Sequence, residues 1–285
     1  PMVVAPDQNR VREGFSRDDL FLCVHEQFLT ETARMADIVL PATTFLEHDD
    51  LYQAGGHTHL LLGLRAIEPL GEARSNHEVI CALAKRLGAE HPGFELSARQ
   101  LIDATLEASG WPRSNELGEH PWHDCATSFE EAHFLNGFGH PDGRFRFAPD
   151  WPALGPYGEG MPELPDHWAV IDASDQEHPY RLVTAPARTF LNTSFTETPS
   201  SREHERLPTL LIHPEDAAEL SIAEAALAQV GNHQGEITLT TRLFEGLQRG
   251  VVVIESIWPN ADFPNDNGIN TLTSTDPAAP NGGGV

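Results

Sequence analysis

Short apolar runs alternate with polar segments near the start of the chain. Leu20–Val24 and Ile38–Leu40 are each short enough to form a buried strand. Thr30, between the two runs, can cap one turn of helix, and Pro41 ends the second run because proline cannot donate to a sheet ladder. The order of strand, short helix and strand predicts an α/β arrangement in this region.

Helical patterns occur on both sides of these runs. The polar stretch Val11–Asp19 predicts a helix, and another is predicted from Ser97 to about Ser109. Ser75–Glu78 has the form of a capping box and opens an amphipathic helix that Gly88 closes. The predicted buried face of this amphipathic helix consists of Val79, Ile80, Leu83, Ala84 and Leu87.

The region from residue 111 to 163 is rich in proline and glycine, which predicts a long connection over the surface. Only Ser128–Asn136 has a helical pattern, and it begins with a second capping box. Pro141–Phe147 predicts a turn followed by a short strand. We therefore predict an α/β domain over residues 1–110, a connection over 111–175 and a second domain over 176–285.

The second domain has the pattern of a small β-rich unit. A helix of one to two turns is predicted from His213, with Pro214 at its first position, and Gly231–Gly235 predicts a hairpin turn. Strands at this spacing suggest a small closed barrel. The predicted strands are Arg181–Thr184, Thr209–Ile212, Ala226–Val230, Gly235–Leu243 and Gly250–Glu255.

The composition narrows the choice of partners. The 285 residues include 18 Lys and Arg against 43 Asp and Glu, a formal charge of -25. This excess of acid argues against nucleic acid or an anionic membrane as a partner, because both require a basic face. A strongly hydrated surface is the simpler interpretation of the acidity.

The three cysteines lie far apart and form no C-x-x-C, which excludes a disulfide framework and a four-cysteine metal site within this chain. We expect Cys23 and Cys81 to be buried as small apolar residues. No apolar run approaches the roughly 20 residues of a membrane span, and no signal peptide is visible. We expect a cytoplasmic protein, and we interpret Pro1 as the cut end of a longer polypeptide.

Polar side chains cluster where the first two predicted strands end. His25 and Glu26 follow the first strand, and His48 follows the second in the run Glu47–Asp50. Ligands of open α/β sheets bind beyond the carboxyl ends of strands, so this cluster is a candidate site. Solvated loop residues are the alternative interpretation.

The loop Thr184–Thr193 has the composition of a phosphate site. Its small residues let backbone N–H groups approach a ligand, Asn192 offers an amide, and Arg188 offers a planar clamp for phosphate. A structural salt bridge is the alternative role for Arg188.

A hydrolase has less support in the sequence. No G-x-S-x-G elbow, Walker loop or G-x-G-x-x-G occurs, so no catalytic constellation can be named. His57 and His59 alternate on one predicted strand face and are candidate zinc ligands, but spacing places no third ligand. A half-buried edge strand is the default interpretation of these two histidines.

Several ordered stretches resemble a known family. Thr30–Glu47, with T-E-T-A-x-x-A-D-I-V-L-P-A-T…E, and Gly71–Asn76 are similar to molybdopterin oxidoreductases of the dimethyl sulfoxide reductase family. Ile212–Ala217 (I-H-P-x-D-A), Gly250–Val253 and Asn270–Thr273 resemble the dinucleotide-binding domain of that family. The resemblance covers nearly the whole chain outside residues 111–150.

The resemblance implies a fold and a cofactor. The first half would be the closing part of a doubly wound α/β domain, and the second half a double-psi β-barrel, truncated at its C-terminus. Together they would close over bis-(molybdopterin guanine dinucleotide) carrying molybdenum. His25 and Glu26 would meet a guanosine, and His48 and Asn76 would lie nearby. The implied contacts to pyrophosphate and pterin are Thr184, Ala185, Ala187, Arg188, Thr189, Asn192, Thr193 and Asn270.

The chain also departs from the family pattern. Ser221–Ala226 has no glycine where the family carries a glycine turn, which predicts a distorted turn or a divergent copy. The histidine often found near Asn192 is also absent.

The resemblance implies a fragment of a two-electron oxidoreductase, with a 4Fe-4S cluster and the molybdenum ligand supplied by the missing part. The implied partners are the rest of the polypeptide and an electron-transfer protein. No metal ligand or catalytic residue is assigned within this chain. A non-catalytic binding or scaffold module is the alternative function.

Overall fold

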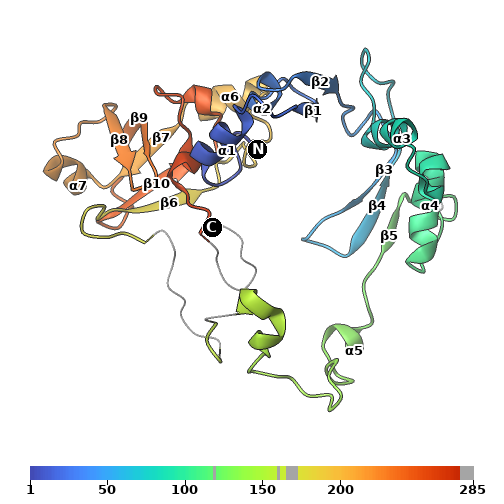
Figure 1. Cartoon of the computed structure of the whole chain (residues 1–285). Coiled ribbons are helices and arrows are strands. Elements are labelled where there is room, and N and C mark those ends of the chain that lie inside the picture. Colours follow the sequence, from blue (N-terminus) through green and yellow to red (C-terminus); the bar gives the residue numbers. More distant parts are fainter. Residues whose placement is uncertain (118–119, 159–160, 165–172, 277–285) are drawn as a thin grey trace. The chain divides into compact units, whose positions relative to one another are not determined.

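The structure is a computed structural model that describes residues 1–117, 120–158, 161–164 and 173–276 (Figure 1). The chain divides into two compact units, and each is described by itself. One unit is Phe21–Phe145, and the other combines Pro1–Leu20 with Arg146–Val285. The domain limits predicted at residues 110 and 175 stay a prediction.

The strand, short helix and strand predicted at the start of the unit Phe21–Phe145 are confirmed. β1 (Cys23–Glu26) pairs in parallel with β2 (Ile38–Pro41), and α2 (Glu31–Arg34) connects them. Thr30 caps α2 by accepting a hydrogen bond from Ala33 N at 3.3 Å. β1 begins and ends later than predicted. His25 and Glu26 are therefore its last residues, whereas the sequence predicts that they follow the strand.

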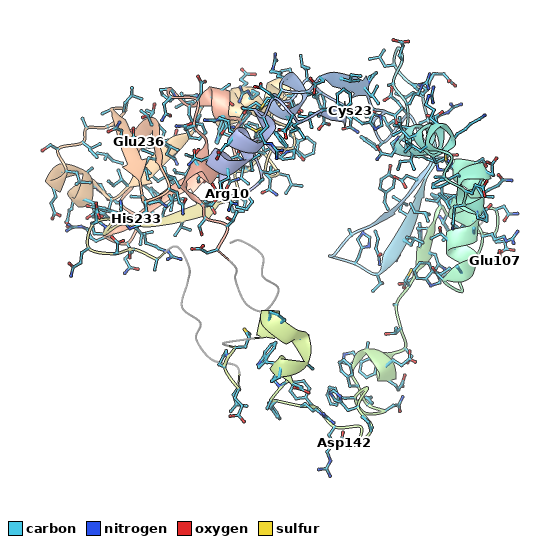
Figure 2. All side chains as sticks on the ribbon, viewed as in Figure 1. Arg10, Cys23, Glu107, Asp142, His233 and Glu236 are labelled. Atoms are coloured by element: carbon cyan, nitrogen blue, oxygen red, sulfur yellow. The ribbon has the colours of Figure 1, made fainter. Side chains whose placement is uncertain are left out.

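The prediction that these strands are buried is wrong. Cys23, labelled in Figure 2, is exposed, and so are Ile38 and Val39, while Cys81 is partly buried. The physical reason is that β1 and β2 form a sheet of only two strands in the described part of the chain. A two-stranded sheet leaves both faces to solvent unless another layer covers it.

A second sheet of this unit contains three antiparallel strands. β4 (His59–Gly63) pairs with β3 (Asp50–Gln53) on one side and with β5 (Trp122–Asp124) on the other. β4 is therefore the central strand, and the edge position predicted for it is wrong. The prediction missed this position because the sequence pattern gives no sign of β5. α4 (Ala98–Ala108) packs Ile102 and Leu106 against Leu60 and Leu62.

The predicted capping boxes are confirmed at the helices that follow. Ser75 and Glu78 cap each other at the start of α3 (Asn76–Leu87), and Gly88 ends α3 in the left-handed conformation at φ 67°. α5 (Phe129–Ala132) begins with the same reciprocal bonds at Ser128. α4 also begins with a capping box, at Ser97, where the sequence predicts a helix start but no box. The short helical turn η1 (Pro92–Glu95) lies between α3 and α4.

The predicted burial of α3 is wrong. Ala84 is the buried residue of its apolar face, whereas Ile80 is 55% exposed and Leu87 81% exposed. The described part of this unit covers only part of that face, at Ala84 and Val79. The short strand predicted within Pro141–Phe147 is also absent: a turn is present, but the described residues after it pair with no strand.

The other unit is built on a mixed sheet of five strands. Parallel pairs join β6 to β10 and β7 to β9, and antiparallel pairs join β10 to β7 and β8 to β9. All five predicted strands and the hairpin are confirmed, whereas the double-psi barrel stays a prediction. The strands are β6 (Arg181–Ala185), β7 (Thr209–Ile212), β8 (Leu227–Gly231), β9 (Glu236–Leu243) and β10 (Val251–Glu255).

The core of this unit lies on one face of the sheet. Alternate residues of β9 and β10 are buried, including Ile237, Leu239 and Ile254, as the two-residue period of strands requires. Phe190 and Trp258 extend the core with ring centroids 4.8 Å apart. The other helical segments are η2 (Trp151–Gly158), α6 (Pro199–Glu205), α7 (Pro214–Glu219), η3 (Asn260–Asp262) and η4 (Ile269–Leu272).

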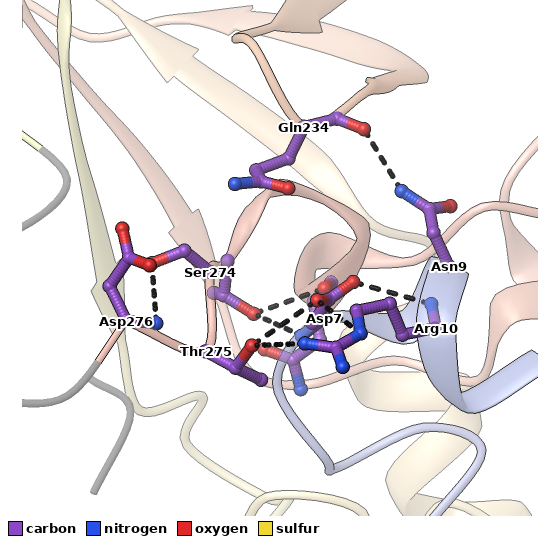
Figure 3. Close-up of polar contacts among 9 residues, drawn as sticks. Asp7, Asn9, Arg10, Gln234, Ser274, Thr275 and Asp276 are labelled. Atoms are coloured by element: carbon purple, nitrogen blue, oxygen red, sulfur yellow. Dashed lines mark hydrogen bonds and ion pairs between the residues drawn. The ribbon is translucent and has the colours of Figure 1, made fainter. Parts of the chain in front are cut away.

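The first residues of the chain belong to the same unit as the β6–β10 sheet. α1 (Gln8–Phe15) begins at the cap Asp7, so the helix predicted over Val11–Asp19 is misplaced. Asp7 N donates to Thr273 O at 3.1 Å, and Asn9 Nδ2 donates to Gln234 O at 2.9 Å (Figure 3). The first bond holds the N-terminal segment against the last described residues, and the second holds it against the turn between β8 and β9.

The I-H-P-x-D-A stretch has a structural role. Asp216, on α7, is buried and accepts hydrogen bonds from Gly250 N at 2.8 Å and from Arg249 Nε. Burial of the carboxyl opposes its ionisation, but the bonds from Gly250 and Arg249 outweigh burial and hold its pKa below the ordinary value. Asp216 thus joins α7 to the start of β10.

The end of α7 keeps a regular form without glycine. Ser221 N donates to Ala218 O and Ile222 N donates to Ala217 O. These two hydrogen bonds form a Schellman motif. Ser221 therefore takes the left-handed conformation, at φ 58°. The distortion expected from the missing glycine is not seen at the helix end. Instead, a serine adopts a backbone conformation that favours glycine.

Candidate functional site

The polar residues predicted in the unit Phe21–Phe145 meet at one end of the β1–β2 pair. Nε2 of His25 donates to Arg74 O at 3.1 Å, and Arg74 lies two residues before Asn76. The same carbonyl accepts Thr43 N at 3.1 Å, so the segment after β2 is joined to the start of α3. His25 and Asn76 therefore come from segments that contact each other directly.

His48 and Glu26 belong to the same cluster. Thr43 Oγ1 lies 2.8 Å from Nδ1 of His48, and the Thr43 carbonyl accepts a bond from Gln27 Nε2 at 2.9 Å. Glu26 holds the backbone of the next residue, because its Oε1 accepts Gln27 N at 2.8 Å. The four predicted residues are partly or fully exposed, so their outer faces are open to a ligand. The sequence does not single out Thr43 as the residue that links them.

A buried carboxylate orders the loop that carries His48. Glu47 accepts hydrogen bonds from Thr44 N at 2.6 Å, Thr44 Oγ1 at 2.8 Å and Leu70 N at 2.6 Å. The bond from the Thr44 backbone is the main cause that lowers the pKa of Glu47 below its ordinary value. Glu47 is therefore a positioning residue, whereas the neighbouring His48 is partly exposed.

The predicted phosphate loop of the other unit is fixed by two buried residues. Ala187 and Phe190 enter the core, while Arg188 and Asn192 between and after them are exposed. Ser256 fixes both ends of the loop, because its N–H donates to Ala185 O at 2.7 Å and its Oγ to Asn192 O at 3.0 Å. The loop thus exposes the side chains of Arg188 and Asn192 on a backbone that the core and Ser256 hold in place.

Three of the predicted loop residues keep their polar side chains available. Arg188 is exposed and has no carboxylate partner among the residues that the structure describes, so the salt bridge that is its alternative role is not formed within them. The side chains of Thr184 and Asn192 are exposed and make no hydrogen bond to another described residue. Asn192 has a positive φ of 51°, which turns the chain at this point.

Two predicted residues are engaged inside the unit. Thr189 donates from its N–H at 2.7 Å and its hydroxyl at 2.6 Å to Glu205. Asn270 Nδ2 donates to Val3 O at 2.9 Å and so helps to hold the N-terminal segment. Thr193 is partly buried, and its carbonyl accepts a bond from Thr196.

The histidine pair considered for zinc gains no third ligand from the described residues. His57 lies before β4 and not on it, and the rings of His57 and His59 meet edge to face at 5.5 Å. The second contact of His59 is with Trp122 at 4.9 Å. No cysteine or carboxylate completes a set of three around these histidines in the described part of the chain.

Comparisons with known proteins identify the family of the chain. Residues 1–86 match the family model described as Molybdopterin oxidoreductase, and residues 180–285 match the Molydopterin dinucleotide binding domain. The chain belongs to the molybdopterin oxidoreductases of the dimethyl sulfoxide reductase family. Both segments that carry the candidate residues fall inside these matches.

Similar proteins of this family cover nearly the whole chain. The chain is 34% identical to the probable oxidoreductase YoaE of Bacillus subtilis, over 100% of its own length and 41% of that protein. It is 28% identical to a trimethylamine-N-oxide reductase of Haemophilus influenzae, over 90% of the chain and 35% of that protein. The chain therefore spans about two fifths or less of these relatives.

A solved structure shows the same fold. Acetylene hydratase from Pelobacter acetylenicus aligns with a TM-score of 0.78 and 20% identity, over 96% of this chain and 40% of that one. The chain thus shares the fold of this hydratase, a mixed α/β architecture with several sheets. No helix in the described ranges is long and apolar enough to cross a membrane.

The donor set of this chain fits a pterin dinucleotide. Arg188 supplies a guanidinium without a carboxylate partner in the described ranges, which suits a pyrophosphate, and Asn192 supplies an exposed amide in the same loop. At the end of β1, a carboxylate and two imidazoles, from Glu26, His25 and His48, can pair with the polar edge of a purine.

Proposed function

We propose that this chain forms the part of a molybdenum oxidoreductase that binds bis-(molybdopterin guanine dinucleotide), and that the full-length protein performs two-electron redox chemistry. The observation that carries the proposal is the loop Thr184–Thr193, where Arg188 is exposed and has no described carboxylate partner, on a backbone fixed by buried neighbours. When bound, the cofactor would supply the redox chemistry, and this chain would supply binding and orientation.

The residues have distinct tasks in this proposal. Arg188 would bind the pyrophosphate, while Thr184, Asn192 and Thr193 would hydrogen-bond the same ligand. The backbones of Ala185 and Ala187 would approach it closely. Thr189 and Asn270 already have partners inside the chain, so we expect them to shape the site and to add at most one further bond each.

The end of the β1–β2 pair would hold a guanosine. His25 and Glu26 would contact the nucleoside, with His48 and Asn76 at its border. The unit that contains β6–β10 would adopt the double-psi barrel of the family. A 4Fe-4S cluster, the molybdenum ligand and a contact for an electron-transfer protein would come from other parts of the full-length protein.

Exposed apolar surface supports a chain that continues into a larger protein. The outer face of α3 and the strand residues Ile38 and Val39 lack cover in the described unit. Large apolar patches on a soluble protein usually mark an interface. We propose that the rest of the α/β domain covers them.

The test compares two arginines of the same unit in the full-length protein. Arg188→Gln removes the proposed phosphate clamp. Arg242→Gln is the control: Arg242 is an exposed arginine on β9 that forms no ion pair with a described residue. A charge-assisted bond contributes about 1.5–3 kcal/mol, so Arg188→Gln should weaken cofactor retention by roughly tenfold or more. Arg242→Gln should leave retention unchanged. Retention is measured as molybdenum and releasable GMP per chain, and equal values for both variants and the wild type would rule the assignment out.

The alternative is a binding or scaffold module without catalysis. The serine at the glycine position of the turn after α7 is the feature that favours it. Because Ser221 keeps the regular helix ending, however, the turn does not argue for a degenerate domain. Substrate turnover by full-length protein loaded with cofactor would decide between the two.

A further inference from the structure

Two segments distant in sequence bring two imidazoles and a carboxylate together in the unit that contains β6–β10. Asp175 and His178 lie just before β6, and His233 lies in the turn between β8 and β9, at the edge of the unit in Figure 2. Nε2 of His233 is 3.0 Å from Asp175 Oδ2, and Nδ1 of His178 is 3.4 Å from Asp175 Oδ1. We call these three residues the histidine–aspartate cluster.

The spacing within the histidine–aspartate cluster suits a small metal ion. One ligand atom from each residue can be chosen so that all three lie within 4.8 Å of one another. Ligands at about 2.1 Å from a tetrahedral zinc ion stand about 3.4 Å apart. Small side-chain adjustments are therefore enough to place the three atoms around one ion.

A nitrogen without a hydrogen bond gives a second indication. Nδ1 of His178 is buried and makes no hydrogen bond, although Asp175 Oδ1 lies 3.4 Å away. A buried polar atom that lacks a hydrogen bond is unfavourable and is rare in native proteins. A cation bound by this nitrogen would remove that cost, because a neutral imidazole offers its lone pair to a metal.

The surroundings hold the ligands in place. Asp175 Oδ1 accepts backbone bonds from Glu177 N at 2.8 Å and His178 N at 2.6 Å, which fixes the carboxylate. The turn that carries His233 is held by Asn232, whose Oδ1 accepts Gln234 N and whose Nδ2 donates to Leu272 O. Supporting bonds of this kind orient the ligands and strengthen metal binding.

The chemistry of the set selects the metal. Imidazole nitrogen and carboxylate oxygen suit zinc and neighbouring divalent transition metals, whereas magnesium and calcium require mostly oxygen ligands. Asp175 and His233 are exposed, so an ion can enter from solvent and a water can complete its coordination. An ion pair between His233 and Asp175 without any metal is the competing explanation.

We propose that the histidine–aspartate cluster binds one divalent transition cation of the zinc type. The bound ion would fasten the segment before β6 to the β8–β9 hairpin. This site is separate from the proposed pterin site, since it shares no residue with the loop Thr184–Thr193 or with the end of β1.

The experiment titrates Zn²⁺ into the full chain after treatment with EDTA, against a competing chelator, with Co²⁺ absorption as a second readout. The wild type should bind one Zn²⁺ per chain, and His178→Asn or His233→Asn should weaken binding at least ~10-fold. His204→Asn is the matched control, because His204 is an exposed histidine of the same unit. Its affinity should equal that of the wild type.

Amide hydrogen exchange distinguishes a variant that has lost a metal ligand from one that no longer folds. Without metal, the amides of β8 and β9 should exchange alike in the wild type and both variants, and Zn²⁺ should slow them only in the wild type. The proposal is overturned if the wild type binds no Zn²⁺, or if both variants still bind it as tightly as the control. Binding that disappears only in His57→Asn would likewise place the ion elsewhere.

Discussion

Replacing Asp216 by alanine tests the junction between α7 and β10. The carboxylate is 2% exposed and holds Gly250 N and Arg249 Nε. Bonds to a buried charged group contribute about 1.5–3 kcal/mol each. Arg249 still donates to Glu215 at 2.8 Å and to Glu219 at 2.6 Å. Losing the bond from Arg249 to Asp216 should therefore cost less than losing the bond from Gly250. Asp216→Ala should therefore destabilise the sheet locally by about 2–4 kcal/mol.

The matched control removes a partner of the same arginine at the surface. The side chain of Glu219 is 65% exposed, and exposed ion pairs contribute about 0.2–1 kcal/mol. Because the chain has two compact units, unfolding need not be a single transition, and amide hydrogen exchange of β7 and β10 is the better assay. Exchange should accelerate roughly 30-fold or more in Asp216→Ala and only slightly in Glu219→Ala. Equal acceleration in the two variants would refute a special role for the buried carboxylate.

The effect of pH follows from the same bonds. The folded pKa of Asp216 is lower than its ordinary value of 3.8, so ionised Asp216 stabilises the fold above that value. The stabilisation is lost as the pH falls through the folded pKa. The difference between wild type and Asp216→Ala should thus shrink below about pH 3.8. A difference that persists undiminished in acid would contradict the assigned ionisation.

Three further changes test other parts of the fold. Ser221→Gly should stabilise the end of α7 by about 0.5–1 kcal/mol in amide hydrogen exchange, because glycine relieves the left-handed strain, whereas Ser221→Ala should not. Gly268→Ala should speed hydrogen exchange at residues 1–8. The added Cβ would collide with Oδ1 of Asn260, and Nδ2 of the same side chain donates to Met2 O. Unchanged exchange would count against this contact. The loop of Glu47 should loosen as the pH falls below 4.5 through its lowered pKa, and Glu47→Gln should abolish that pH dependence in exchange measurements.

The sequence predicts elements well where local signals are strong. The capping boxes at Ser75 and Ser128 use residues within one turn, so they can be recognised without knowledge of the fold. The strands β6–β10 show short apolar runs between turn residues, and each can be predicted from its run. β5 escapes prediction because Trp122–Asp124 is too short and polar to signal a strand, and it becomes one only by pairing with β4.

Burial and the site depend on distant residues, which limits prediction from sequence. The apolar face of α3 has the right period, but the described part of its unit leaves Ile80, Leu83 and Leu87 of that face exposed. The exposure of Arg188 could be expected, whereas the engagement of Thr189 by Glu205 could not, because 16 residues separate the pair. The histidine–aspartate cluster is harder still, since His233 and Asp175 are 58 residues apart.

Cofactor analysis of the purified full-length protein tests the central claim most directly. Molybdenum is quantified by elemental analysis, and the pterin is measured by the fluorescence of its oxidised form, with GMP released by acid as the mark of the dinucleotide. The account predicts molybdenum together with both the pterin and GMP in the wild-type protein. Well-folded protein that contains neither molybdenum nor pterin would contradict it.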